Sequence, residues 1–148
     1  MSYTDRLHYS IYRAAPDEFP LMAENLIRQV AVDGHVLRLV IFGSPENNDQ
    51  YMARRSFFRS LAEKYFVDCI PVLSYVAQPS LEEGLVMEVH YCENSDEDQV
   101  AYKSFEGFPY VTVENDEGRF LYAGGLYSDI FHSVDAQAVE VFSTAGGL

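Results

Sequence analysis

The segment HVLRLVIFG, residues 35–43, is the strongest constraint on how this chain folds. It is a nearly continuous run of strand-forming apolar residues, and strands of this kind are usually buried on both faces. The following segment, residues 44–66, has apolar residues at helical spacing with arginines between them. We therefore predict a buried strand followed by a helix. The apolar positions of that helix are Tyr51, Phe58, Leu61 and Tyr65.

A strand and a helix are predicted before this pair. Residues 7–14 are rich in β-forming types and indicate a strand. Residues 16–34 fit a helix that starts at a proline followed by two acidic residues, which favour the positive end of the helix dipole. Gly34 is a typical stop for that helix. Pro20 fits its first turn if the helix starts late.

Two strands joined by a short connection are predicted next. Residues 71–78 and 85–92 alternate in side-chain direction, and the segment PSLEEG between them indicates a hairpin. On the second strand Glu88 and His90 share one face. This is consistent with two alternatives, the wall of a chemical site or a solvated sheet face.

The rest of the chain predicts a loop, a hairpin and a helix. Residues 93–99 are acidic and polar, and residues 108–128 indicate a hairpin that turns at Asp116, Glu117 and Gly118. Residues 133–148 predict a helix. The predicted fold class is α+β, a mixed sheet with helices packed on one face, to which a hairpin and a helix are added at the C-terminus.

Composition limits the classes of function. The 148 residues suit one domain, and 48% of them are hydrophobic, which favours a packed core over disorder. A net charge of −13 disfavours binding to nucleic acid and to anionic membranes. There is no apolar run of membrane-spanning length and no secretory signal, so we expect a cytoplasmic protein.

The cationic and sulfur-containing residues give two further expectations. Arg54, Arg55, Arg59 and Lys64 lie in one segment and predict a local basic face on this acidic chain. Two cysteines do not make a disulfide framework, so we expect reduced thiols packed in or near a sheet.

Several short segments resemble the reactive intermediate deaminase (Rid) family, which has a chorismate mutase-like fold. PVLSYVAQPSLEEGLVMEVHYC looks like its last two strands, with a proline opening the first and a glutamate midway along the second, here Pro71 and Glu88. GFPYVTVENDEGRFLYAGGL looks like the hairpin that opens a Rid domain, with matches at Gly107, Tyr110 and Gly124.

The order of these segments gives a domain hypothesis. Residues 1–92 resemble a Rid-like β-α-β-α-β-β unit, and residues 93–109 form an acidic linker. Residues 110–148 then either complete a permuted domain or begin a second Rid-like domain. The second arrangement resembles the chorismatases, which carry two such domains.

The resemblance implies a site for a small acid. Rid deaminases hydrolyse imines and enamines derived from amino acids, bind the substrate carboxylate with an arginine on the penultimate strand and use a glutamate on the last strand to position water. The arginine position is Leu73, which cannot bind a carboxylate, although Arg38 or Arg13 could supply a cation from a neighbouring strand. Glu88 is the candidate catalytic residue. The candidate ligand-binding residues are Leu73, Tyr75 and Tyr110.

The function hypothesis is therefore a Rid-like small-molecule-binding or scaffolding domain without the usual deaminase arginine, forming a homotrimer or pseudo-trimer. The alternatives are the non-catalytic N-terminal part of a chorismatase-like hydrolase, or an imine deaminase with an altered pocket. Glu88 has a simpler interpretation as a solvated strand residue. No cofactor is expected, and Glu88 with His90 supplies too few ligands for a metal.

Overall fold

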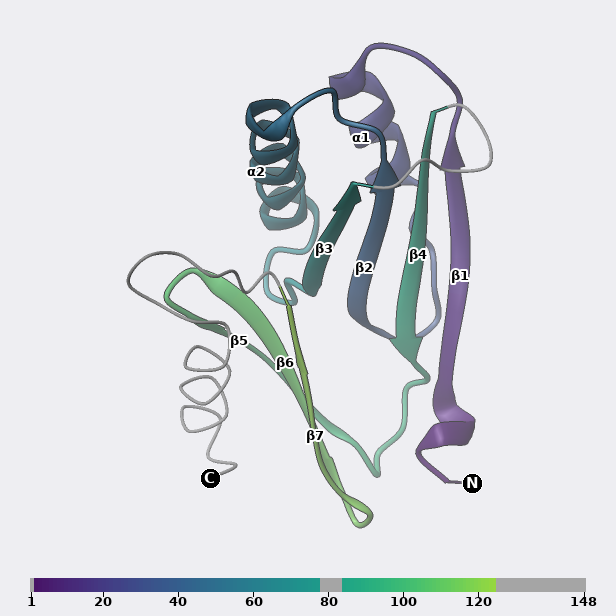
Figure 1. The fold of residues 1–148 in the computed structure, drawn as a ribbon. Coiled ribbons are helices and arrows are strands. Elements are labelled where there is room, and N and C mark those ends of the chain that lie inside the picture. The colour runs from purple at the N-terminus through teal and green to yellow at the C-terminus, as the bar shows by residue number, and fades with distance from the viewer. Residues whose placement is uncertain (1, 78–83, 125–148) are drawn as a thin grey trace.

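The computed structural model describes residues 2–77 and 84–124, and these form an α+β structure (Figure 1). The predicted C-terminal helix lies outside the described residues. The elements, in chain order, are η1 (Thr4–Arg6), β1 (Leu7–Ala14), α1 (Phe19–Arg28), β2 (His35–Gly43), α2 (Asn48–Tyr65), β3 (Val72–Ala77), β4 (Leu85–Cys92), β5 (Gln99–Phe105), β6 (Phe108–Asn115) and β7 (Gly118–Ala123).

The strands form two sheets. Sheet A has the order β1-β4-β2-β3, in which β2 and β3 are parallel and the other neighbours are antiparallel. Sheet B has the order β5-β6-β7 and is antiparallel throughout. The predicted mixed sheet is thus confirmed, and a separate three-stranded sheet accompanies it.

The predicted hairpin between residues 71–78 and 85–92 is wrong. The strands β3 and β4 exist, but β2 lies between them, and β4 pairs with β1 on its other side. The burial of the strands explains this order. Most side chains of β2 are buried, and β4 is buried at Leu85, Met87, Val89 and Cys92, whereas β1 has several exposed residues and takes an edge. The two strands with the most apolar surface therefore occupy the centre of the sheet.

Strand β5 was not predicted and lies in the segment interpreted as an acidic linker. It pairs with β6 from Gln99 opposite Glu114 to Phe105 opposite Phe108. The turn between them is Glu106-Gly107, with φ values of 49° and 82°. Two consecutive positive φ values are typical of the tight turns that join antiparallel strands. The predicted hairpin that turns at Asp116 and Glu117 is confirmed as β6 and β7.

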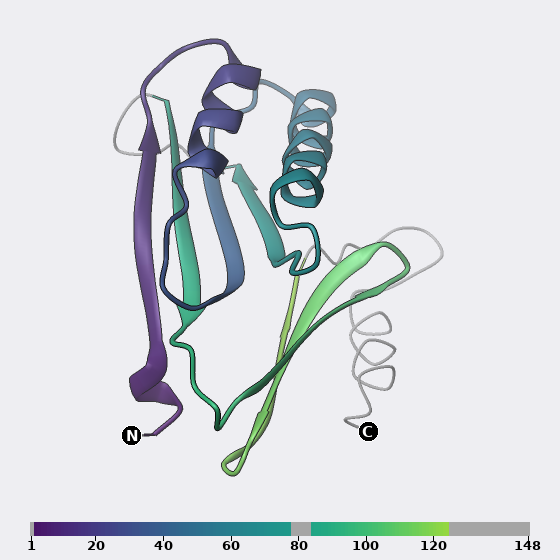
Figure 2. The ribbon, with the colours of Figure 1, turned by 180° about the vertical axis from the view of Figure 1, so that it is seen from behind.

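Both helices pack on one face of sheet A, as predicted, and Figure 2 shows them in front of the sheet. Helix α1 starts late, at Phe19, with Pro20 in its first turn, and α2 starts after Asn47, whose side chain accepts a hydrogen bond from the Gln50 backbone N–H. Helix α1 ends at Arg28, well before Gly34. Gly34 instead allows the backbone to pass close to β4, because a Cβ at this position would lie 2.1 Å from the Cys92 carbonyl oxygen.

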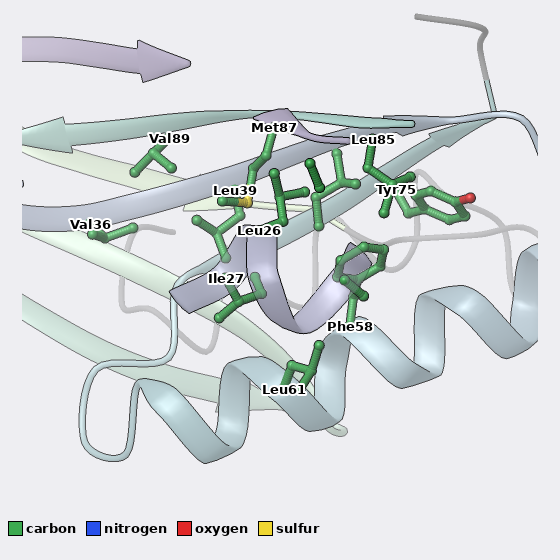
Figure 3. Packing of buried hydrophobic residues seen from close by; sticks show 13 residues of the cluster. Leu26, Ile27, Val36, Leu39, Phe58, Leu61, Tyr75, Leu85, Met87 and Val89 are labelled. Atoms are coloured by element: carbon green, nitrogen blue, oxygen red, sulfur yellow. The ribbon is translucent and has the colours of Figure 1, made fainter. Parts of the chain in front are cut away.

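The main core lies between the helices and sheet A (Figure 3). Phe58 of α2 is fully buried, and its ring centroid lies 5.5 Å from that of Phe19 and 5.7 Å from that of Tyr75. The other buried members are Ala14, Ala23, Leu26, Ile27, Val36, Leu39, Ile41, Leu61, Leu85, Met87 and Val89.

Sheet B covers one end of the other face of sheet A. A second cluster joins Leu37, Val72 and Cys92 of sheet A to Val111 and Val113 of β6. Burial raises the pKa of Cys92 to about 11, which is expected of an unreactive packed thiol, while Cys69 is exposed. The described part of the chain thus has three layers, helices, sheet A and sheet B.

No helix of the described residues is both long and apolar enough to span a bilayer.

The Tyr75 hydroxyl gives a prediction about stability. It is buried and has no hydrogen-bond partner among the described residues, whereas the Tyr51 hydroxyl donates to the Tyr75 carbonyl at 2.8 Å. We expect Tyr75→Phe to leave the free energy of unfolding unchanged or to raise it by up to about 1 kcal/mol, because an unpaired buried hydroxyl is removed. Urea unfolding measures this. Tyr51→Phe is the matched control and should lose about 1 kcal/mol; a greater loss in Tyr75→Phe would contradict the expectation.

Candidate ligand-binding cleft

The predicted site residues do not come together. Leu73 and Tyr75 face the helices, where Tyr75 is 5% exposed and stacks on Tyr51 with ring centroids 5.2 Å apart. Glu88 projects from the opposite face of sheet A, since the neighbouring Met87 and Val89 belong to the helix-side core. Tyr110 is buried in sheet B. Within the described chain, Leu73 and Glu88 therefore lie on opposite faces of sheet A.

Glu88 instead lies on a part of sheet A that no described helix and no buried residue of sheet B covers. This surface, here called the open face, includes Tyr9, Ile11, Arg38, Glu88 and His90. The Glu88 carboxylate Oε2 lies 3.3 Å from His90 Nε2, and both side chains are partly exposed. Arg38 is opposite His90 across the sheet and donates to the Ser74 hydroxyl at 3.4 Å. On the described part of this face, Glu88, His90, Arg38 and Ser74 form a partly exposed polar cluster.

The cations considered for the site also lie on this face. Arg38 opposes His90, and Arg13 opposes Val86, one alternate position from Glu88. Both arginines are exposed. The register therefore places Glu88 between β1, which carries Arg13, and β2, which carries Arg38. The sequence could not predict this arrangement, because it depends on β4 lying between β1 and β2.

A cleft of about 430 Å³ lies elsewhere, between the C-terminal half of α2 and the β5–β6 hairpin. Helix α2 supplies Arg59 and Glu63, the segment after it supplies Val67, Asp68 and Ile70, and the hairpin supplies the opposite wall. The residues of that wall are Tyr102, Lys103, Ser104, Gly107 and Pro109.

Two cations and two acids line the cleft. The Arg59 guanidinium lies 5.3 Å from the centroid of the Phe108 ring, a cation–π contact that restricts its orientation. Lys103 is exposed on β5, and Glu63 and Asp68 are exposed beside it. Burial raises the pKa of Tyr102, whose hydroxyl donates to the Val36 carbonyl at 2.7 Å, so this phenol is a structural group and not an acid or base.

A separate small hollow shares Arg59, Ile70 and Pro109 with the cleft and reaches Leu73. It is lined by Arg55 and Arg59 on α2 together with Pro71, Leu73, Pro109 and Gly124. The basic segment of α2 thus faces the position at which the resemblance predicted an arginine. The basic segment predicted from the sequence supplies Arg55 and Arg59 to this wall. Tyr102 and Lys103 were not predicted as site residues, because the segment that contains β5 was interpreted as a linker.

No group of three or more metal-ligating side chains occurs within residues 2–77 and 84–124. Comparisons with protein-family models, with curated proteins and with solved structures found no match to this chain.

Proposed function

We propose that this protein is a small-molecule-binding domain and that its ligand is a small organic acid held between α2 and the β5–β6 hairpin. The observation that carries the proposal is the cleft of about 430 Å³ with Arg59 on one wall and Lys103 on the other. Its volume lies within the usual range of small-molecule sites, roughly 300–1,000 Å³. The chain has a net charge of −13 and 10 lysine and arginine residues, and two of these cations line the same cleft.

The chemistry of the walls favours a carboxylate. A guanidinium presents two parallel N–H donors that match the two carboxylate oxygens, and the Phe108 ring limits the orientations of Arg59. Glu63 and Asp68 offer acceptors for an ammonium group at the same cleft. Val67 and Ile70 supply apolar contact. A free amino acid or a related small zwitterion would engage all three kinds of group.

The resemblance to the Rid family also points to a small acid, and a distant relation to that family remains part of the proposal. The geometry supports binding over hydrolysis, because Glu88 lies on the open face and does not line the cleft. The acids that do line it, Glu63 and Asp68, are exposed to solvent. A carboxylate poised to activate water is usually held in a more enclosed position.

Titration calorimetry with a panel of free amino acids and small monocarboxylic acids tests this proposal. We expect at least one acid to bind, and Arg59→Gln to weaken its affinity at least tenfold, because a charge-assisted hydrogen bond contributes about 1.5–3 kcal/mol. Lys103→Gln should weaken it less, since Lys103 is exposed.

Arg54→Gln is the matched control, because Arg54 lies in the same helix but packs over Phe19 at 4.5 Å and does not line the cleft. It should leave the affinity unchanged. If no acid binds, or if Arg59→Gln and Arg54→Gln behave alike, the proposal fails.

A further inference from the structure

We propose that two copies of this chain associate by antiparallel pairing of their β1 strands, in place of the homotrimer or pseudo-trimer that the resemblance implies. No described strand pairs with the outer edge of β1, because β1 ends the order β1-β4-β2-β3. Both ribbon views show it at the margin of the described structure, with no other described strand or helix along its outer side (Figures 1 and 2). Strand β1 contributes no residue to the cleft, which lies between α2 and the β5–β6 hairpin.

The backbone of the middle of β1 is oriented for such pairing. The Glu93 N–H donates to the Arg6 carbonyl at 2.9 Å, so Arg6 and every second residue after it face β4. Hydrogen-bond direction alternates along an antiparallel strand, and Tyr9 and Ile11 therefore direct their N–H and C=O groups outward. The Gln29 side chain, which donates to the Arg13 carbonyl at 2.8 Å, confirms that this alternate set faces away from β4.

The side chains of the same two residues are exposed and apolar. Tyr9 is 65% exposed and Ile11 is 45% exposed, and both project from the open face. Natural edge strands are commonly protected by charge, proline or a bulge. Between Leu7 and Tyr12 this strand has none of these, and its pairing with β4 runs without a register shift.

Charge also favours this edge for a second copy. The chain carries a net charge of −13, so most contacts between two copies bring acidic groups together. Strand β1 contains no acidic residue. An occupant with the same sequence therefore meets no carboxylate on the strand that it joins.

Two-fold symmetry and Gln29 select the register. A two-fold axis perpendicular to the sheet at Ser10 places Tyr9 of each copy opposite Ile11 of the other, and these residues exchange all their outward backbone bonds. The Arg13 carbonyl keeps its bond to Gln29. The tyrosines and isoleucines then form cross-strand pairs on the open face, where aromatic and β-branched side chains pack well.

The geometry at the axis provides a direct test. The two Ser10 residues become a non-hydrogen-bonded pair with Cα atoms about 4.5 Å apart, which is within the range that a disulfide spans. In a Cys69→Ser background, which removes the exposed thiol, we expect Ser10→Cys to form a disulfide-linked dimer under mild oxidation. Ser56→Cys, exposed on α2, is the matched control and should remain largely unlinked.

Light scattering after size exclusion measures association without a cross-link. We expect a mass of twice 16.8 kDa for the wild type at high concentration, and a monomer for Ile11→Lys and Tyr9→Lys. Circular dichroism establishes that the variants are folded. If a lysine variant does not fold, the disulfide cross-linking of Ser10→Cys tests the dimer without it.

A monomer at every concentration, a trimer, or a dimer that the lysine variants leave intact would overturn the proposal. Equal cross-linking of Ser10→Cys and Ser56→Cys would overturn it as well.

Discussion

We expect Asp98→Ala to lower the free energy of unfolding by about 3–5 kcal/mol, because it removes one partner of a buried ion pair. The Asp98 side chain is fully buried and accepts two hydrogen bonds from Arg6, at 2.8 and 3.0 Å. It also accepts one from Asn115 at 2.9 Å. The substitution leaves the Arg6 guanidinium, 2% exposed, without the carboxylate that accepts two of its hydrogen bonds, and it removes a link between η1 and the segment before β5. Urea unfolding followed by circular dichroism measures the loss.

The pH dependence distinguishes the ion pair from simple loss of packing. The hydrogen bonds from Arg6 hold the pKa of Asp98 below its ordinary value of 3.8. A carboxyl whose pKa is lowered by folding stabilises the protein above its unfolded pKa and loses that effect as the pH falls. The difference between wild type and Asp98→Ala should therefore be full at neutral pH and shrink below about pH 4.

Glu97→Ala is the matched control, since Glu97 contacts the same guanidinium at 3.0 Å but is 63% exposed. It should cost less than about 1 kcal/mol. Equal losses for the two substitutions, or a difference from wild type that does not depend on pH, would contradict the assigned role of Asp98.

Phe58→Ala should cost about 3–5 kcal/mol. Phe58 is fully buried where α2 meets α1 and sheet A, and it contacts the rings of Phe19 and Tyr75. Removing the ring loses its burial and leaves a cavity, because two helices and a sheet fixed by backbone hydrogen bonds cannot close fully around it. Thermal and urea unfolding both measure the effect.

Phe57→Ala is the control for this prediction. Phe57 has the same side chain one residue earlier, packs edge-on against Phe19 at 5.8 Å and is only partly buried. Its loss should be clearly smaller than that of Phe58→Ala. The reverse order would mean that α2 turns a different face to the core.

Periodicity in the sequence predicted most of the elements. The alternation in residues 85–92 assigned Glu88 and His90 to one face and Met87 and Val89 to the other, as the structure has them. Strand pairing was not predictable in this way, because the short connection between β3 and β4 resembles a hairpin and local pattern does not encode which strands are neighbours. Strand β5 was missed because QVAYKSF follows an acidic tract and has few apolar residues.

Because strand pairing could not be predicted from the sequence, the candidate site was predicted at the wrong place. The sequence placed Leu73 and Glu88 on the two strands of one hairpin, but β2 separates these strands, and the two side chains point to opposite faces of sheet A. The cleft joins α2 to a strand that was interpreted as linker, so only the basic segment of α2, which supplies Arg59 to the cleft and Arg55 to the small hollow, was visible in the sequence.

The position of β4 has a consequence for how the chain folds. Sheet A is complete only when β4, its last strand in the sequence, has inserted between β1 and β2. Until residue 92 has left the ribosome, β1 has no hydrogen-bonding neighbour within the described chain and the two strands that β4 will join have no bridge. Such long-range pairing carries a high loop-closure entropy and slows folding. We therefore expect folding of sheet A to be late and cooperative, with the insertion of β4 as the step that commits the nascent chain to its native topology.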